Sequence, residues 1–175
     1  MAHVGFIRDK LDIKFLILYV AARVESPLPF HDMQALCMCD EGVDYFSFSE
    51  CMKDLVRTEH LTCSAEEFYA ITDKGRKNSA ICESSLPPSV CLRADEGIES
   101  INRRLRREKQ IRSTVSPREG GGFTVHLTMC DDSLSPLFDL SLMAPREESA
   151  HELAERFQKD PQEVYEEVLR VVFPQ

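Results

Sequence analysis

The 175-residue sequence predicts an α+β fold in two parts, residues 1–85 and residues 86–175. Apolar side chains recur at helical spacing through most of the first part. Residues 111–143 instead alternate apolar and polar side chains with the period of two that is typical of strands. The serine- and proline-rich segment 84–89 interrupts both patterns and predicts the boundary. A chain of this length has room for one or two small domains.

The composition is acidic, with a formal net charge of −9 and a hydrophobic content of 43% that is ordinary for a globular protein. This charge disfavours nucleic-acid binding, because Lys and Arg residues that neutralise phosphates supply much of that affinity. The longest apolar run, Phe15–Ala22, is far shorter than the roughly 20 residues that a membrane span needs. Met1–Lys10 lacks the basic and apolar regions of a signal peptide. We therefore expect a cytoplasmic protein without a membrane segment.

Two helices are expected first. Residues 10–24 carry a wide apolar stripe at helical spacing, as in a helix packed inside a core. Residues 25–29 end this helix, because they contain two prolines. A second helix over residues 30–39 follows, since Pro29 suits a first-turn position and Asp32 lies near the positive end of the helix.

A third helix is expected from Asp44, a favourable N-cap residue, to about Thr58. Its apolar face repeats at helical spacing, and the opposite face carries mixed charges. Two short strands, Thr62–Ala65 and Phe68–Thr72, follow around an acidic turn at residues 66–67, and a fourth helix covers residues 73–82.

This order predicts a function for residues 1–85. Two helices joined by a short turn form a helix-turn-helix, whose second helix enters the major groove of DNA. A hairpin after that helix is the wing. The first part is therefore predicted to be a winged helix-turn-helix.

A long linker helix is expected over residues 88–110, with a narrow apolar stripe. Residues 86–119 carry eight basic and five acidic side chains and form the positively charged block of the chain. One interpretation is a solvated helix with charge pairs four residues apart, such as Glu99 with Arg103. The other is contact with phosphates or a protein partner through Arg103, Arg104, Arg106 and Arg107.

The C-terminal part is expected to hold a three-stranded antiparallel sheet covered by two helices. Three alternating segments between residues 111 and 143 are separated by turns at 119–122 and 131–136. Helices are expected over residues 147–158 and from Asp160-Pro161, where an N-cap precedes a proline in the first turn.

The sequence contains no motif that predicts an enzyme, a cofactor or a metal site. The glycines at 120–122 lie between strands, whereas a phosphate-binding loop precedes a helix. The seven cysteines are either reduced, mostly buried thiols or include a redox-sensing pair. His126 lies on the polar face of its strand and faces either solvent or a ligand. An enzymatic site would need a pocket that joins His126 to an acid or a thiol.

A family resemblance rests on several short motifs. Phe68–Gly75, with an aromatic pair before Ile71-Thr72-x-Lys74-Gly75, resembles the end of the wing in bacterial winged-helix regulators of the PadR and MarR kind. Nearly the whole chain resembles a clostridial domain-of-unknown-function family of proposed transcriptional regulators. The further motifs that carry this resemblance are Phe15–Tyr19, Ser26–Pro29, Tyr45-Phe46, Leu86-Pro87 and Tyr165. The resemblance implies a winged-helix fold and DNA binding.

We therefore expect a winged-helix transcriptional regulator that binds double-stranded DNA as a homodimer. Residues 86–175 would mediate dimerisation or sense a small-molecule effector. The residues expected to face the major groove are Ser47, Ser49, Lys53 and Arg57, and those expected to contact phosphates are Lys74, Arg76 and Lys77.

The alternative is a protein-interaction module that keeps the winged-helix shape without binding DNA. Glu50 and Asp54 lie beside the basic residues of the third helix, and Glu66-Glu67 forms the turn of the wing. These acids and the net charge of −9 favour the alternative.

Overall fold

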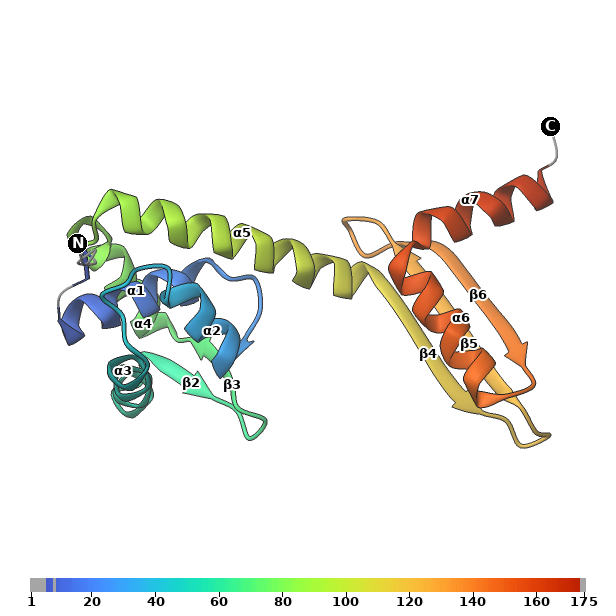
Figure 1. Ribbon diagram of the computed structural model, residues 1–175, viewed down its shortest axis with the longest axis horizontal. Coiled ribbons are helices and arrows are strands. Elements are labelled where there is room, and N and C mark those ends of the chain that lie inside the picture. Colours follow the sequence, from blue (N-terminus) through green and yellow to red (C-terminus); the bar gives the residue numbers. More distant parts are fainter. Residues whose placement is uncertain (1–5, 8, 174–175) are drawn as a thin grey trace. The chain divides into compact units, whose positions relative to one another are not determined.

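A computed structural model describes residues 6, 7 and 9–173 of the chain, which form two compact units, Met1–Leu105 and Arg106–Gln175 (Figure 1). The described part contains seven α-helices and two three-stranded antiparallel sheets, which confirms the α+β class. Most of the N-terminal segment considered above, residues 1–5 and 8, lies outside the described residues. No helix of the described part is long and apolar enough to cross a membrane.

The elements of the first unit lie close to their predicted bounds. Asp9, Asp44 and Thr72 each start a helix by accepting hydrogen bonds from backbone N–H groups of the first turn. In chain order the elements are α1 (Lys10–Arg23), β1 (Leu28–Pro29), α2 (Phe30–Cys37), α3 (Tyr45–Arg57), β2 (Leu61–Cys63), β3 (Phe68–Ile71), α4 (Asp73–Cys82), a 3-10 turn (Glu83–Ser85) and the part of α5 (Pro88–Gln110) that ends at Leu105.

The core of the first unit is built around α1. Its residues from Leu16 to Ala21 are all buried, so this helix is apolar on every side, as expected of a helix enclosed by others. The helices α2, α3 and α4 contact it. The sheet beside them has the order β1-β3-β2. The strand β1 was not predicted, because Leu28 and Pro29 are too few residues to show alternation. Only their pairing with Tyr69 and Phe68 of β3 makes them a strand.

The helix α5 belongs in large part to the first unit. Its buried face, Val90, Ala94 and Ile98, joins the same core as α1. Polar contacts fix it as well: Arg93 lies 2.7 Å from the carboxylate of Asp40. The first unit therefore extends to Leu105, beyond the boundary after residue 85 that the serine- and proline-rich segment suggested.

The second unit contains β4 (Ile111–Pro117), β5 (Phe123–Cys130), β6 (Pro136–Ala144), α6 (Glu147–Lys159) and α7 (Pro161–Val172). The strands form the predicted antiparallel meander in the order β4-β5-β6. The core lies between the sheet and α6, with Val125 and Phe157 fully buried.

The helix α7 differs from the expectation that two helices cover the sheet. Val164, Tyr165 and Val168 pack partly against the core, but α7 then runs beyond the end of the sheet (Figure 1). Asp160 caps it at the turn after α6, and that turn directs the chain away from the strands. Its last residues, among them Val171, are exposed.

Candidate nucleic-acid interface

One face of α3 is exposed along the whole length of the helix. Phe46, Glu50, Lys53 and Arg57 recur at helical spacing on this face, while the opposite face is buried in the core. Phe46 is 81% exposed, which is unusual for so large an apolar side chain. We call these four residues the α3 stripe.

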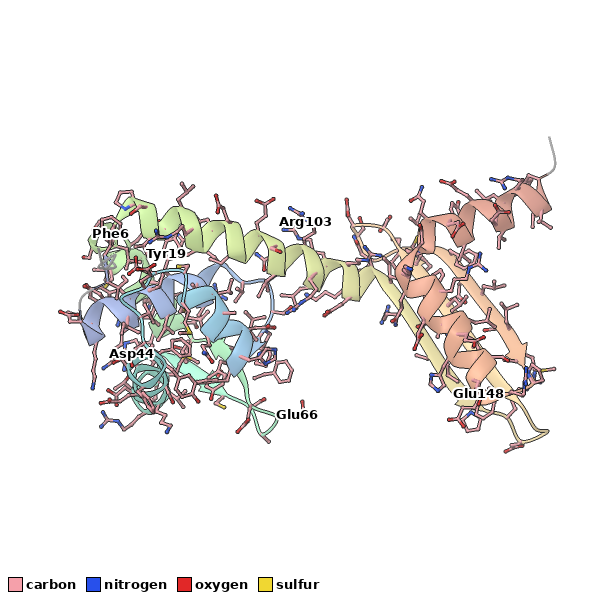
Figure 2. The ribbon with its side chains drawn as sticks, viewed as in Figure 1. Phe6, Tyr19, Asp44, Glu66, Arg103 and Glu148 are labelled. Carbon is pink, nitrogen blue, oxygen red and sulfur yellow. The ribbon has the colours of Figure 1, made fainter. Side chains whose placement is uncertain are left out.

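The two serines expected to face the major groove are less exposed than the α3 stripe. Ser47 and Ser49 are both half-buried. A hydrogen bond from the Ser47 side chain, together with the backbone N–H groups of Ser47 and Phe46, lowers the pKa of Asp44. Ser47 therefore serves first to cap α3 (Figure 2 labels Asp44 at the start of this helix).

Two lysines of α1 neutralise the acids of α3. Lys10 Nζ lies 2.6 Å from Glu50 Oε2, and Lys14 Nζ lies 3.0 Å from Asp54 Oδ2. Asp54 also accepts a hydrogen bond of 2.9 Å from Arg57. The hydrogen bonds from Lys14 and Arg57 lower the pKa of Asp54, so this acid stays ionised.

Cations outnumber acids among the ion pairs that join α1 to α3, once Lys53 is included. Four basic side chains, Lys10, Lys14, Lys53 and Arg57, lie with two acidic ones, Glu50 and Asp54. The sequence interpretation missed the two lysines, because they lie forty residues away in the chain. The sequence did contain a signal for this contact. Lys10 and Lys14 are four residues apart, as are Glu50 and Asp54, so each pair lies on one side of its helix.

The motif Ile71-Thr72-x-Lys74-Gly75 holds the end of α3 against the start of α4. The Thr72 hydroxyl accepts a hydrogen bond of 3.0 Å from the N–H of Gly75 and donates one of 2.8 Å to the carbonyl of Glu59. Lys74 Nζ donates to the carbonyl of Thr58 over 2.7 Å. A Cβ atom on Gly75 would lie 2.2 Å from the carbonyl oxygen of His60, so only glycine fits there.

The pKa of His60 is affected by the charges around the end of α3. Its ring nitrogens lie 2.8 Å from the Thr58 hydroxyl and 2.6 Å from the Asn78 amide. Burial and the nearby charges of Lys74 and Lys14 lower the pKa of His60. The two lysines therefore place positive charge near the C-terminal end of α3, where the helix dipole favours cations.

The remaining basic residues of α4 differ in their contacts. The Arg76 guanidinium donates a hydrogen bond of 3.3 Å to the carbonyl of Ala22, near the end of α1. Lys77 is exposed. Of the three phosphate contacts expected from this helix, Lys74 and Arg76 also fasten α4 to its neighbours.

Arg103, Arg104 and Arg107 of α5 each contact a group within their own unit. Arg103 lies 3.3 Å from Glu99, in the charge pair expected for a solvated helix. Arg104 binds the buried carboxylate of Asp32. Arg107 donates to the carbonyls of residues 158 and 159 at the end of α6. Arg106 is exposed. The pair of Arg103 with Glu99 agrees with the interpretation as a solvated helix, and contact with phosphates or a partner stays a prediction.

A shallow groove lies on the hairpin of β2 and β3. Its volume is about 500 Å³, and its lining includes Pro27, Thr62, Phe68 and Ala70. The acidic turn of the hairpin is exposed, with Glu66 at its tip (Figure 2). This surface is mainly apolar and bordered by negative charge.

The side chains to consider for catalysis are the cysteine thiols and His126. All seven cysteines are free, and burial raises the pKa of Cys37, which keeps this thiol protonated. His126 Nε2 lies 2.7 Å from Asp139 Oδ1 on the exposed face of the second sheet. Among the residues that the structure describes, no three His, Cys, Asp or Glu side chains gather as a metal site would require.

Comparison with known proteins places nearly the whole chain in one family. A family model described as a domain of unknown function (DUF4364) matches residues 13–172. This match agrees with the expectation of a domain-of-unknown-function family. No curated protein and no solved structure matches the chain.

Proposed function

This chain belongs to the DUF4364 family, and we propose that it is a winged-helix transcriptional regulator that binds double-stranded DNA as a homodimer. The order of elements supports this proposal. The helices α2 and α3 are joined by a short turn, α3 is followed by the antiparallel hairpin of β2 and β3, and α4 comes next. In such an arrangement α3 is the helix that enters the major groove.

The observation that carries the proposal is the positive charge of the exposed face of α3. The acids Glu50 and Asp54 counted against DNA binding in the sequence, but Lys10 and Lys14 neutralise them. Lys53, and Arg57 although it also bonds Asp54, then meet phosphates or base edges in this proposal. Phosphate neutralisation by such cations supplies much of the affinity for DNA.

The other basic residues take distinct roles in this proposal. Lys74 and Lys77 contact the phosphate backbone beside the groove, and Arg76 fixes α4 so that they can do so. Ser47 and Ser49 contribute hydrogen bonds at the start of α3. The exposed arginines of α5, Arg103, Arg104, Arg106 and Arg107, contribute further phosphate contacts in this proposal.

The homodimer follows from the energetics of a small site. A single α3 offers few phosphate contacts, and the net charge of −9 opposes approach to DNA. Two copies related by a two-fold axis double the contacts on two half-sites. The second unit carries exposed apolar side chains that a second copy can cover, among them Leu137, Leu142 and Met143.

The test is selection of bound duplexes from a random DNA library by the full chain, followed by binding measurements at several salt concentrations. We expect one or more enriched sequences with two-fold symmetry, and an affinity that falls steeply with salt. If neither the selected duplexes nor random duplex bind in a salt-sensitive manner, the DNA proposal is wrong.

The groove on the hairpin supports a second candidate function, a protein-interaction module of the same fold. Phe68 is partly exposed in this groove, and Glu66 at the tip would repel a DNA backbone. An extended peptide with basic flanks fits such a surface. Under this alternative, Phe68→Ser abolishes peptide binding, and substitution of Lys53 has no effect.

A further inference from the structure

We propose that β6 of one copy pairs antiparallel with β6 of a second copy, so that two sheets join into one sheet of six strands. The inference rests on the homodimeric part of the proposed function and is independent of DNA contact. It names the dimer interface, which the proposed function leaves open.

The first observation is the free edge of β6. The strand spans Pro136–Ala144 and pairs with β5 on one side only (Figure 1). A strand at the edge of a sheet presents unpaired N–H and C=O groups, and proteins usually protect such edges with lysine, proline or a bulge. Leu137–Met143 contains neither lysine nor proline. The irregularity in the pairing with β5 falls at Leu137, which lies between the pairs Met129–Phe138 and Cys130–Pro136, so that Phe138–Met143 keeps a regular register.

The second observation is the exposure of apolar side chains on both faces of this strand. Met143 is 59% exposed on the face away from α6, and Leu142 is 38% exposed on the face toward it; Leu137, at the irregularity, is 55% exposed. The helix α6 lies mainly over β4 and β5. The edge of the sheet at β6 therefore remains uncovered, as does part of Leu153 on α6.

The third observation identifies a second copy as the partner. The strand segment Leu-Phe-Asp-Leu-Ser-Leu-Met is nearly symmetric about its central residue, Leu140. A two-fold axis through Leu140, perpendicular to the sheet, places each residue opposite its counterpart in the second copy. The resulting pairs are Leu137 with Met143, Phe138 with Leu142, and Asp139 with Ser141.

These pairs are chemically matched. Every apolar side chain meets an apolar one, and the Asp139 carboxylate meets the hydroxyl of a serine, which can donate a hydrogen bond. An axis through Asp139 would place two carboxylates directly opposite each other. An axis through Ser141 would set Asp139 against Met143. The symmetry of the strand therefore selects one register.

The joined sheet also completes the core. A perpendicular axis keeps the two α6 helices on the same face of the sheet. Leu142 then lies at the seam between the two copies, where it can be buried. Isologous pairing of this kind is the form that two-fold symmetric dimers take.

The mass of the full chain in solution, measured over a range of concentrations, tests the interface. Leu137→Lys with Met143→Lys sets lysine against lysine in both outer pairs. We expect this double variant to weaken the dimer by roughly 100-fold or more. Leu137→Lys with Met143→Glu instead sets lysine against glutamate, and we expect it to bring the dimer back to within about tenfold of the unaltered chain.

The control is Val171→Lys with Val172→Lys on α7, which changes charge equally at another exposed apolar site and should leave the dimer intact. The inference is overturned if the lysine pair has no effect, if the lysine–glutamate pair does not restore the dimer, or if the α7 variant dissociates it. Should the lysine pair fail to fold, a mixture of the single variants Leu137→Lys and Met143→Glu replaces it, and absence of a heterodimer decides against the pairing. A monomeric unaltered chain disproves the homodimer, whereas a dimer that binds no duplex disproves only the DNA contact.

Discussion

Lys74 Nζ donates a hydrogen bond of 2.7 Å to the carbonyl oxygen of Thr58, and this contact joins the first turn of α4 to the C-cap of α3. The carbonyl groups at the end of a helix lack partners within the helix and carry partial negative charge. A lysine is therefore favourable there. The same residue places a positive charge beside the surface that we assign to DNA, so its structural role and its proposed binding role coincide.

Removal of this charge should be detectable at His60. We expect Lys74→Met to raise the pKa of His60, because a nearby cation opposes protonation of the imidazole. The measurement is an NMR titration of the imidazole C–H signals. Lys77→Met is the matched control and should leave the pKa of His60 in place. An unchanged titration in Lys74→Met would show that the two side chains are not close in solution.

Gly75 should tolerate no side chain. Gly75→Ala places a Cβ atom 2.2 Å from the carbonyl oxygen of His60, and backbone must move to accommodate it. We expect a loss of about 1–3 kcal/mol in the free energy of unfolding, measured by urea denaturation. Gly120→Ala, where nothing lies within 4 Å of the new atom, is the control and should be close to neutral. Equal stability of the two variants would contradict the close packing of α4 on residue 60.

Asp40 should make the stability of the first unit depend on pH. Burial disfavours its charged form, but the N–H groups of Ile7, Phe6 and Gly42 and the guanidinium of Arg93 outweigh burial and lower its pKa from 3.8. A carboxyl with a lowered folded-state pKa stabilises the fold above its unfolded pKa, and this contribution is lost as pH falls toward the folded value.

We therefore expect Asp40→Asn to cost about 2 kcal/mol at neutral pH, because the variant cannot make hydrogen bonds to a charged carboxylate. The variant should also lose less stability than the unaltered chain as pH falls below about 4. Urea denaturation across this range measures both effects. Glu119→Gln, in the exposed turn between β4 and β5, serves as control. A variant with the unaltered acid dependence would refute the role assigned to Asp40.

Lys53 and Arg57 should each contribute to DNA affinity. We expect Lys53→Ala and Arg57→Ala to weaken binding of the selected duplex by roughly tenfold each. The slope of log affinity against log salt should fall by about one for each cation that no longer meets a phosphate. Lys109→Ala, which removes an equal charge from α5, is the control. Binding that is insensitive to both substitutions would move the DNA surface away from α3.

Phe46 should contact a thymine methyl group. It lies in the first turn of α3, and the N-terminal residues of a helix in the major groove contact base edges. Replacement of the contacted thymine by uracil removes only the methyl group. We expect this change to weaken binding by roughly three- to fivefold, since burial of one such group is worth about 0.8 kcal/mol. With Phe46→Ala the two duplexes should bind equally. The exposed Ile81→Ala is the control, and it should still distinguish thymine from uracil.

The helices and the second sheet were predictable because their signals are local. A capping residue and an apolar repeat specify where a helix begins and which side is buried, as Asp44 and the buried face of α3 illustrate. Alternation specified the meander of β4, β5 and β6. Local signals did not specify β1, which exists only through its pairing with β3, or the direction of α7 after Asp160.

The ion-pair partners of the charged side chains at the candidate site were less predictable. The sequence placed Lys53 and Arg57 on the exposed face of α3, and the structure agrees. It did not indicate that Lys10 and Lys14 lie beside Glu50 and Asp54, because charges on two helices meet only when the helices pack. Nor did it show that Arg104 and Arg107 are bound to groups within the protein.

The sequence alone therefore determined the α+β class, the order of the helices and of the strands other than β1, and the exposed face of α3, since each depends on the periodicity and caps of one segment. Tertiary structure decided the sign of the charge on that face, the extension of the first unit to Leu105 and the free edge of β6. These properties arise from contacts between residues far apart in the chain. Such contacts exist only after the apolar faces of α1, α3 and α5, and of the sheet and α6, have packed together.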